Sequence, residues 1–153
     1  PLWRWLLEGA PVDAVSLGGG LSLAAALLYA AGVFWTLGYD TIYAVQDLED
    51  DALAGVKSSA RRLGAAAPRA VLAFYAISLF LALSAGVLGG ASLIFWPAIA
   101  LYGVQLSRQA QRFRIDDPKG ALALFQSNAL AGLTLFLALC AGHISAQGLP
   151  AFN

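Results

Sequence analysis

Charged side chains are absent from three long stretches of the chain and frequent in the segments between them. The uncharged stretches are residues 14–39, 70–107 and, apart from His143, 120–153. A helix needs about 20 apolar residues to cross the hydrocarbon core of a bilayer. The first and third stretches therefore each hold one crossing, and the second holds two, with a turn near Gly86, Gly89 and Gly90. The pattern predicts membrane-spanning helices at about 21–39, 70–88, 92–107 and 121–142.

The residue content of these stretches favours helices over strands. Alanine and leucine dominate them, whereas buried strands are rich in β-branched residues. Core helices of soluble proteins carry a polar stripe, which these stretches lack. Hydrophobic residues make up 59% of the chain. Charged residues make up 12%, about half the share usual in soluble domains. The sequence therefore predicts an all-α fold, a polytopic membrane helical bundle with about four transmembrane helices.

The charge balance and the cysteine content exclude several other classes of protein. The formal net charge is zero, and nucleic-acid binding requires a basic face. A disordered chain would combine low hydrophobicity with high charge. Cys140 is the single cysteine, so the chain can form neither an intramolecular disulfide nor a cysteine-based zinc site.

The basic residues predict the orientation of the bundle. Eight of the nine lie in two segments, one between the first and second predicted helices and one between the third and fourth. They are Lys57, Arg61, Arg62 and Arg69 in the first segment, and Arg108, Arg112, Arg114 and Lys119 in the second. Basic loops stay in the cytoplasm. Two helices separate the segments, so both face the same side, and we expect that side to be cytoplasmic.

Acidic residues cluster directly after the first predicted helix. Five acids fall between residues 40 and 51, and no strong helix breaker occurs between Thr36 and Ala54 except Gly38. We therefore expect the first helix to continue to about residue 54, giving a helix over 21–54. At about 100° per residue, Asp40, Asp47 and Asp51 would then share one face. The rise between Asp47 and Asp51 is about 6 Å, which suits a shared divalent ion.

The chemistry of this cluster indicates a hard cation. Carboxylates without a neighbouring histidine or cysteine suit Mg²⁺, which also accepts phosphate oxygens as ligands. Lys57, Arg61 and Arg62 follow closely and can neutralise a diphosphate. The alternative is a solvated helical extension without chemistry. Acids near a helix C-terminus oppose the helix dipole, which makes a purely structural extension less favourable.

The stretch YDTIYAVQDLEDDALAGVKSSARRLG at residues 39–64 resembles the second aspartate-rich motif of the UbiA superfamily of intramembrane prenyltransferases. Its form is most similar to that of the 4-hydroxybenzoate polyprenyltransferase branch. The stretch FQSNALAG at 125–132 is similar to the final helix of that family. The haem O, menaquinone and chlorophyll synthase branches share the chemistry, but their second motifs differ from this one.

The resemblance implies nine helices around a central cavity, in which two aspartate-rich motifs hold Mg²⁺ against a polyprenyl diphosphate. It implies that the polyprenyl group passes to the ring of 4-hydroxybenzoate in ubiquinone biosynthesis. By position in the motif, it makes Asp47 and Asp51 the metal ligands of the second motif. It also implies site roles for four other residues: Lys57 and Arg62 as diphosphate partners, and Asp40 and Tyr43 as catalytic residues facing the cavity.

The first aspartate-rich motif of the family, typically N-D-x-x-D-x-x-x-D, has no counterpart here. Glu8 and Asp13 are the acids before Tyr39, and the chain begins with Pro1 and contains no methionine. Residues 1–153 therefore resemble the C-terminal half of such an enzyme. We expect this half to be inactive alone and to need an N-terminal half that carries the first motif. We expect it in a bacterial inner membrane, with the aspartate-rich loop cytoplasmic.

Two other classes of function remain open from the residues alone. One is a cation-transport subunit whose acids line the mouth of a cation path, although the later helices carry no charge. The other is a non-catalytic membrane scaffold. Asn128 lies in a predicted membrane helix, where polar side chains bond neighbouring helices. A direct contact of Asn128 with substrate is the alternative. Trp35 is typical either of a membrane interface or of a cavity wall.

Overall fold

The computed structural model describes residues 16–17, 21–46, 55 and 59–147. They form five helices of nine residues or more, together with two short helical elements and an antiparallel pair of two-residue strands. The elements are β1 (Ser16–Leu17), β2 (Leu21–Ser22), α2 (Leu23–Tyr43), α4 (Ser59–Leu63), the 3-10 turn η1 (Gly64–Ala66), α5 (Ala67–Leu88), α6 (Phe95–Arg112), α7 (Pro118–Gln126) and α8 (Asn128–Gln147). The all-α fold is confirmed.

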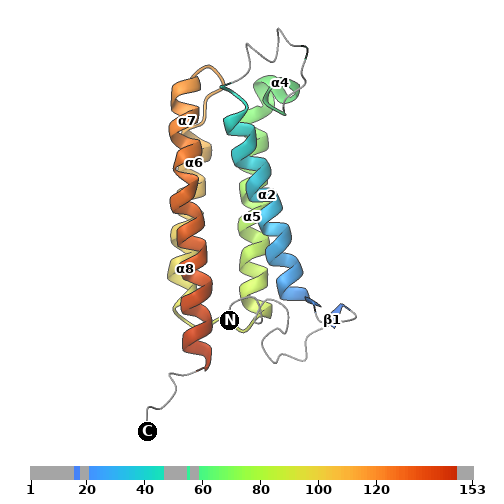
Figure 1. The fold of residues 1–153 in the computed structure, drawn as a ribbon, viewed down its shortest axis with the longest axis vertical. Coiled ribbons are helices and arrows are strands. Elements are labelled where there is room, and N and C mark those ends of the chain that lie inside the picture. Colours follow the sequence, from blue (N-terminus) through green and yellow to red (C-terminus); the bar gives the residue numbers. More distant parts are fainter. Residues whose placement is uncertain (1–15, 18–20, 47–54, 56–58, 148–153) are drawn as a thin grey trace.

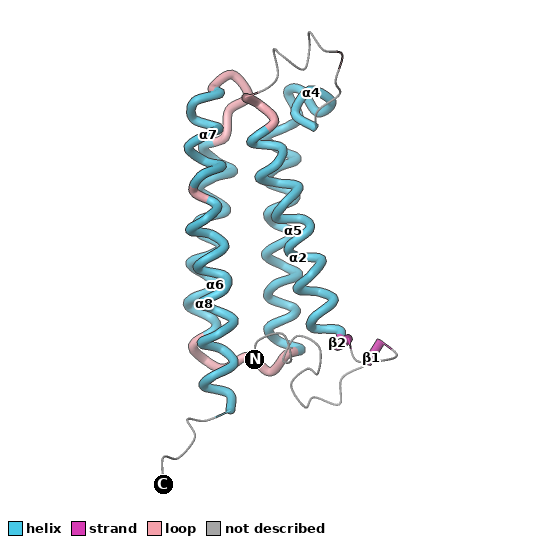
Figure 2. Tube along the Cα trace, in the orientation of Figure 1, coloured by secondary structure: helices cyan, strands magenta, loops and turns pink. Residues whose placement is uncertain are grey.

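The long helices run side by side as two pairs (Figure 1). Helix α2 packs along α5, and α6 packs along α8, while contacts of α5 with α6 and of α2 with α7 join the pairs. Figure 2 shows the connection between α5 and α6 at one end of the bundle and the one between α6 and α7 at the other. Gly90 has a φ of 65° in the first of these turns, as the glycine-rich sequence predicts.

Small residues lie where the helices approach closely. A Cβ atom added to Gly38 would overlap the ring of Tyr75, and one added to Gly86 would overlap the ring of Phe95. The fully buried residues include many alanines: Ala31, Ala60, Ala67, Ala82, Ala131 and Ala138. Some large apolar side chains, such as Phe95 and Tyr102, are buried among them, while others point outward, as Tyr29 and Phe80 do with 78% and 69% exposure. Small residues at close helix contacts and apolar side chains on the surface are typical of a bundle packed within lipid.

Three segments are long and apolar enough to cross a membrane: Leu23–Tyr43, Ser59–Leu88 and Pro118–Gly142. The chain is thus an integral membrane protein. The third predicted span, 92–107, forms as helix α6, but this helix extends beyond residue 107 and its second half is polar. The polar residues are Gln105, Ser107, Arg108, Gln109, Gln111 and Arg112. They lower the hydropathy of α6, so this helix packs within the bundle but is less apolar than a typical membrane span.

Two helix boundaries differ from those expected. Helix α2 ends at Tyr43, and a turn follows at Ala44–Gln46, so the expected continuous helix to residue 54 is wrong at this point. Gly55 has a φ of 72°, a left-handed conformation that glycine adopts at little cost, and the residues on either side of it lie outside the described part of the chain. The last predicted helix is divided at Ser127 into α7 and α8.

Candidate active site

The C-terminal turn of α2 presents two of the predicted site residues. Asp40 is exposed, and Tyr43 is 42% exposed. Thr41 and Ile42 lie between them in sequence and are buried. Residues three apart are neighbours on a helix surface, so Asp40 and Tyr43 lie on one outward face. This part of the expected site is therefore present as a surface at the end of the bundle that carries α4 and α7 (Figure 1).

The turn after α2 changes the geometry expected for the acids. The N–H of Val45 donates to the carbonyl of Ile42 at 3.3 Å, and the N–H of Gln46 donates to the carbonyl of Tyr43 at 3.0 Å, each three residues back instead of four. These bonds close a turn in place of a continuing helix, and the helical register that would align Asp40 with the later acids is interrupted. Asp47, Asp51 and Lys57 lie outside the described residues.

Arg62 belongs to the short helix α4, where it is exposed to solvent beside Arg61. Helix α4 contacts α2, and Ala60 of α4 is fully buried, which fixes this helix against the bundle. Arg62 is thus placed at the same end of the molecule as Asp40 and Tyr43 (Figure 2). The described residues on both sides of the aspartate-rich segment therefore meet at one end of the bundle.

A chain of aromatic rings joins this end of α2 to α7. The ring of Tyr43 lies 4.8 Å from that of Phe125, centroid to centroid, and the ring of Tyr39 lies 5.8 Å from Phe125. The ring of Trp35 meets Tyr39 edge to face at 5.4 Å. Such pairs add to the stability that burial provides. Phe125 was not predicted as a site residue, although it begins the FQSNALAG stretch that carries the second resemblance.

Asn128 is hydrogen-bonded to Trp35, the ring of this aromatic chain that lies farthest from Phe125. Its Oδ1 accepts a hydrogen bond of 2.9 Å from Nε1 of Trp35, and its Nδ2 donates to the carbonyls of Leu124 and Phe125 at 3.2 Å. The side chain is 7% exposed. The predicted role in bonding a neighbouring helix is confirmed. Both ends of the amide have partners within the protein, so the geometry gives no support to a direct contact with substrate.

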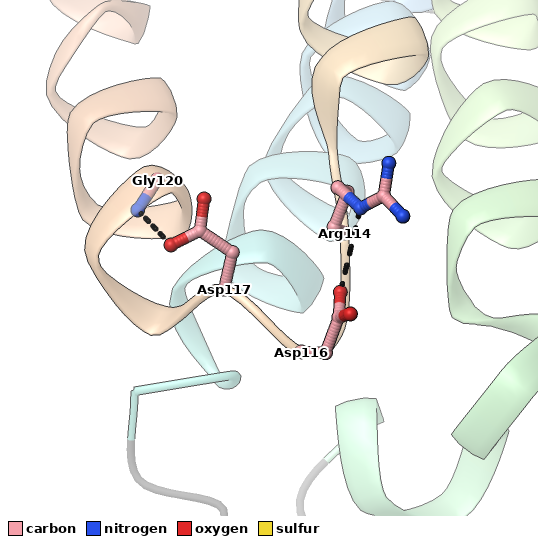
Figure 3. A network of polar contacts seen from close by, with 4 residues as sticks. All are labelled: Arg114, Asp116, Asp117 and Gly120. Carbon is pink, nitrogen blue, oxygen red and sulfur yellow. Dashed lines mark hydrogen bonds and ion pairs between the residues drawn. The ribbon is translucent and has the colours of Figure 1, made fainter.

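The second charged connection lies at the same end of the bundle and has structural partners (Figure 3). Nε of Arg114 lies 3.5 Å from Oδ1 of Asp116, and both side chains are more than 70% exposed. Oδ1 of Asp117 accepts a hydrogen bond of 2.9 Å from the N–H of Gly120, which caps α7. These two acids serve the turn and the helix end.

No group of three or more His, Cys, Asp or Glu side chains with the spacing of a metal site occurs among the described residues. Asp40 is the acid that the described part of α2 contributes. Its carboxylate has the oxygen donors that Mg²⁺ prefers. The two predicted metal ligands, Asp47 and Asp51, follow α2 in the aspartate-rich segment and lie outside the described residues.

Comparison with known proteins decides the family. Residues 9–140 match the UbiA prenyltransferase family. The chain belongs to this family. The match covers α2 through most of α8, together with the aspartate-rich segment that carries the resemblance. No solved structure gives a significant match to this UbiA-family chain.

Curated relatives of this UbiA-family chain carry the name 4-hydroxybenzoate polyprenyltransferase, mitochondrial. The protein from Drosophila pseudoobscura pseudoobscura is 39% identical over 127 residues, which are 82% of this chain and 32% of that protein. The protein from Homo sapiens is 38% identical over 76% of this chain and 32% of its own length. The protein from Caenorhabditis elegans is 37% identical over 89% of this chain and 38% of its own length. The chain spans about a third of the length of the relatives it matches.

Proposed function

We propose that this chain is part of a longer, Mg²⁺-dependent enzyme that transfers a polyprenyl group from polyprenyl diphosphate to the ring of 4-hydroxybenzoate. The observation that carries the proposal is the aspartate-rich segment at 39–64, within a chain that belongs to the UbiA prenyltransferase family. The names of the relatives support 4-hydroxybenzoate as the acceptor and ubiquinone biosynthesis as the pathway. The first aspartate-rich motif would come from an N-terminal half.

The chemistry of each side chain suggests a separate role for each site residue. Asp47 and Asp51 would hold Mg²⁺, and the ion supplies positive charge that offsets the charge of the diphosphate. Lys57 and Arg62 would bind diphosphate oxygens, a task that suits the guanidinium because it donates two parallel hydrogen bonds. Asp40 and Tyr43 would face the reacting groups, and their common exposed face on α2 supports this assignment.

The transfer replaces a ring C–H bond by a C–C bond and releases diphosphate. The C–O bond between the allylic carbon and the diphosphate breaks, and the diphosphate leaves with the bonding electron pair. A π electron pair of the 4-hydroxybenzoate ring, at the carbon ortho to the hydroxyl, forms the new C–C bond. That ring carbon then loses its proton to the released diphosphate, and the electron pair of the broken C–H bond restores aromaticity. The exposed ring of Tyr43, backed by Phe125, offers an electron-rich surface to the allylic cation.

The membrane placement follows the same reasoning. We infer an inner membrane with the aspartate-rich segment on the cytoplasmic side, because the basic residues gather at that end. The expected bacterial membrane stays a prediction, since the relatives named above are mitochondrial.

Prenyl transfer in lipid vesicles tests the proposal. The chain would be compared alone and joined to the N-terminal half of a family member, with 4-hydroxybenzoate, a polyprenyl diphosphate and Mg²⁺ supplied. We expect 3-polyprenyl product from the joined protein only, and a loss of at least about a hundredfold in Asp47→Ala or Asp51→Ala, as for removal of a group that stabilises developing charge. Asp116→Asn is the matched control, because Asp116 is an exposed acid paired with Arg114.

Each outcome separates the proposal from its rivals. Activity in the isolated chain would contradict the need for a second half. A joined protein that is folded but inactive would favour the membrane scaffold. Mg²⁺ flux through vesicles without prenyl transfer would favour the cation-transport subunit.

A further inference from the structure

A groove of about 590 Å³ runs along the outer side of the bundle between α6 and the broken helix α7–α8. Its lining changes character along its length. Leu101 and Val104 of α6 and Leu130 of α8 form an apolar part, and all three are about half exposed. Arg108 and Arg112 form a cationic part at the end where the basic residues gather. The groove therefore runs from an apolar wall to a charged one.

The lining of the groove changes from apolar to cationic in the direction that leads from the membrane interior to the membrane surface. Leu101, Gln105, Arg108 and Arg112 follow one another at helical spacing on one face of α6. They span about 16 Å from apolar to cationic. Asp117, the N-cap of α7 in the chain after α6, also lines the groove. From the membrane interior outward, the groove thus presents apolar side chains, amides, guanidiniums and a carboxylate.

A buried amide in the groove lining lacks one partner. Gln109 lines the groove and is 2% exposed. Its Nε2 donates to Oγ of Ser127 at 2.7 Å, while Oγ of Ser127 donates to the carbonyl of Leu124 at 2.6 Å. This pattern fixes the orientation of the amide. Its Oε1 has no hydrogen-bond partner among the described residues, although a buried acceptor without a partner is costly. The amide of Gln109 is thus a buried, fixed part of the groove floor, and its Oε1 is not open to a ligand in the groove.

We propose that the groove binds one phospholipid of the cytoplasmic leaflet whose headgroup carries both a phosphodiester and a primary ammonium. Arg108 and Arg112 bind the phosphate, because guanidinium groups donate paired hydrogen bonds to phosphate oxygens. The ammonium lies outside the phosphate in such a lipid and donates to the carboxylate of Asp117. An acyl chain follows the apolar wall. Basic pockets between membrane helices on the cytoplasmic side are known to hold lipid headgroups.

The carboxylate of Asp117 distinguishes this headgroup from other phospholipids. A purely anionic headgroup would bring its phosphate to the arginines but would leave the carboxylate of Asp117 facing a negative ligand. A choline headgroup has a cation without N–H groups, so it cannot donate a hydrogen bond to the carboxylate of Asp117. The inference rests on the groove and not on the prenyltransferase assignment, so either can fail without the other.

Native mass spectrometry of the intact protein in detergent tests the proposal. Phosphatidylethanolamine, phosphatidylcholine and phosphatidylglycerol with identical acyl chains would be titrated separately. We expect phosphatidylethanolamine to bind about tenfold or more tightly than the other two, the size of one charge-assisted hydrogen bond. The double variant Arg108→Gln, Arg112→Gln should bind it at least about tenfold more weakly. Arg69→Gln, at an exposed arginine of the same end outside the groove, should leave binding unchanged.

A second variant keeps the test decisive if the double variant fails to fold. Asp117→Asn removes the carboxylate charge, but asparagine caps helices as well as aspartate does. This variant should bind phosphatidylethanolamine and phosphatidylcholine with similar affinity. Equal binding of these two lipids by the unmodified protein would overturn the proposal. So would a preference for phosphatidylglycerol, or unchanged preference in a folded Asp117→Asn protein.

Discussion

The hydrogen bond between Trp35 and Asn128 joins two residues 93 positions apart in the chain. It forms within the apolar bundle, where an unpaired indole N–H or amide finds no water. Interhelical hydrogen bonds in membranes contribute about 0.6 kcal/mol on average and up to about 1.7 kcal/mol. We predict a coupling free energy in this range between Trp35→Phe and Asn128→Ala. Unfolding free energies of the four proteins of a double-mutant cycle, measured by denaturant titration in micelles, give this value.

Ser84→Ala is the control for this cycle, because the hydroxyl of Ser84 bonds the carbonyl of Phe80 in its own helix. Combined with Trp35→Phe, it should give additive changes in the unfolding free energy. Additive changes for the Trp35 and Asn128 pair as well would show that the bond contributes no net stability.

We predict that replacement by alanine changes the free energy of unfolding in opposite directions at two glycines of α2. A Cβ atom on Gly38 would overlap the ring of Tyr75, whereas one on Gly32 would meet no atom within 4 Å. We expect Gly38→Ala to lower the unfolding free energy by about 1–3 kcal/mol, as overpacking does. Gly32→Ala should raise it by up to about 1 kcal/mol through helix propensity. Thermal unfolding followed by circular dichroism compares them, and equal effects would contradict the close packing of α2 on α5.

Helix α7 depends on the cap that Asp117 provides. The carboxylate accepts the hydrogen bond from Gly120, and Pro118 occupies a position near the helix start where its missing N–H is not needed. We predict that Asp117→Ala destabilises the protein by about 0.5–2 kcal/mol, whereas Asp117→Asn keeps most of the stability. Hydrogen exchange of the first amides of α7 should rise in the alanine variant only. Equal exchange in both variants would mean that the cap is not the source of order there.

Helix positions were largely predictable from the sequence, and helix ends were less so. The uncharged stretches located the helices because lipid demands apolar residues over a fixed length. The turn after Tyr43 was missed because the stretch has no proline and its only glycine is Gly38. The break at Ser127 was missed because its partners are Gln105 and Gln109 on another helix. Such bonds depend on tertiary packing, which periodicity does not record.

In the candidate site too, residues within the motif were predictable from the sequence, whereas a residue brought in by helix packing was not. The motif at 39–64 pointed to Asp40, Tyr43 and Arg62, and the structure places these three at one end of the bundle. The assignments of Asp47, Asp51 and Lys57 remain predictions. The place of Phe125 in the candidate site depends on the packing of α7 against α2, which brings its ring to that of Tyr43. A ring contact between distant helices leaves no spacing signal in one sequence.

At the scale of the whole molecule, both basic connections lie at one end and the glycine-rich turn at the other (Figure 1). This arrangement requires α5 and α6 to traverse the bundle in opposite directions. Helix α6 is the element whose crossing the composition supports least, since its second half is polar. The packing of α6 against α8 and α5 can offset part of this polarity, because the Nε2 groups of Gln105 and Gln109 donate hydrogen bonds to Ser127.

The sidedness of two exposed positions tests this crossing directly. Leu93 in the glycine-rich turn is 84% exposed, and the side chain of Asp116 after α6 is 74% exposed, so one helix separates them. In a Cys140→Ser background, we predict that an impermeant maleimide labels Leu93→Cys in spheroplasts. Asp116→Cys should be labelled only in inside-out vesicles, because basic segments stay in the cytoplasm. Labelling of both from one side would show that α6 does not cross, and exchanged sides would reverse the orientation.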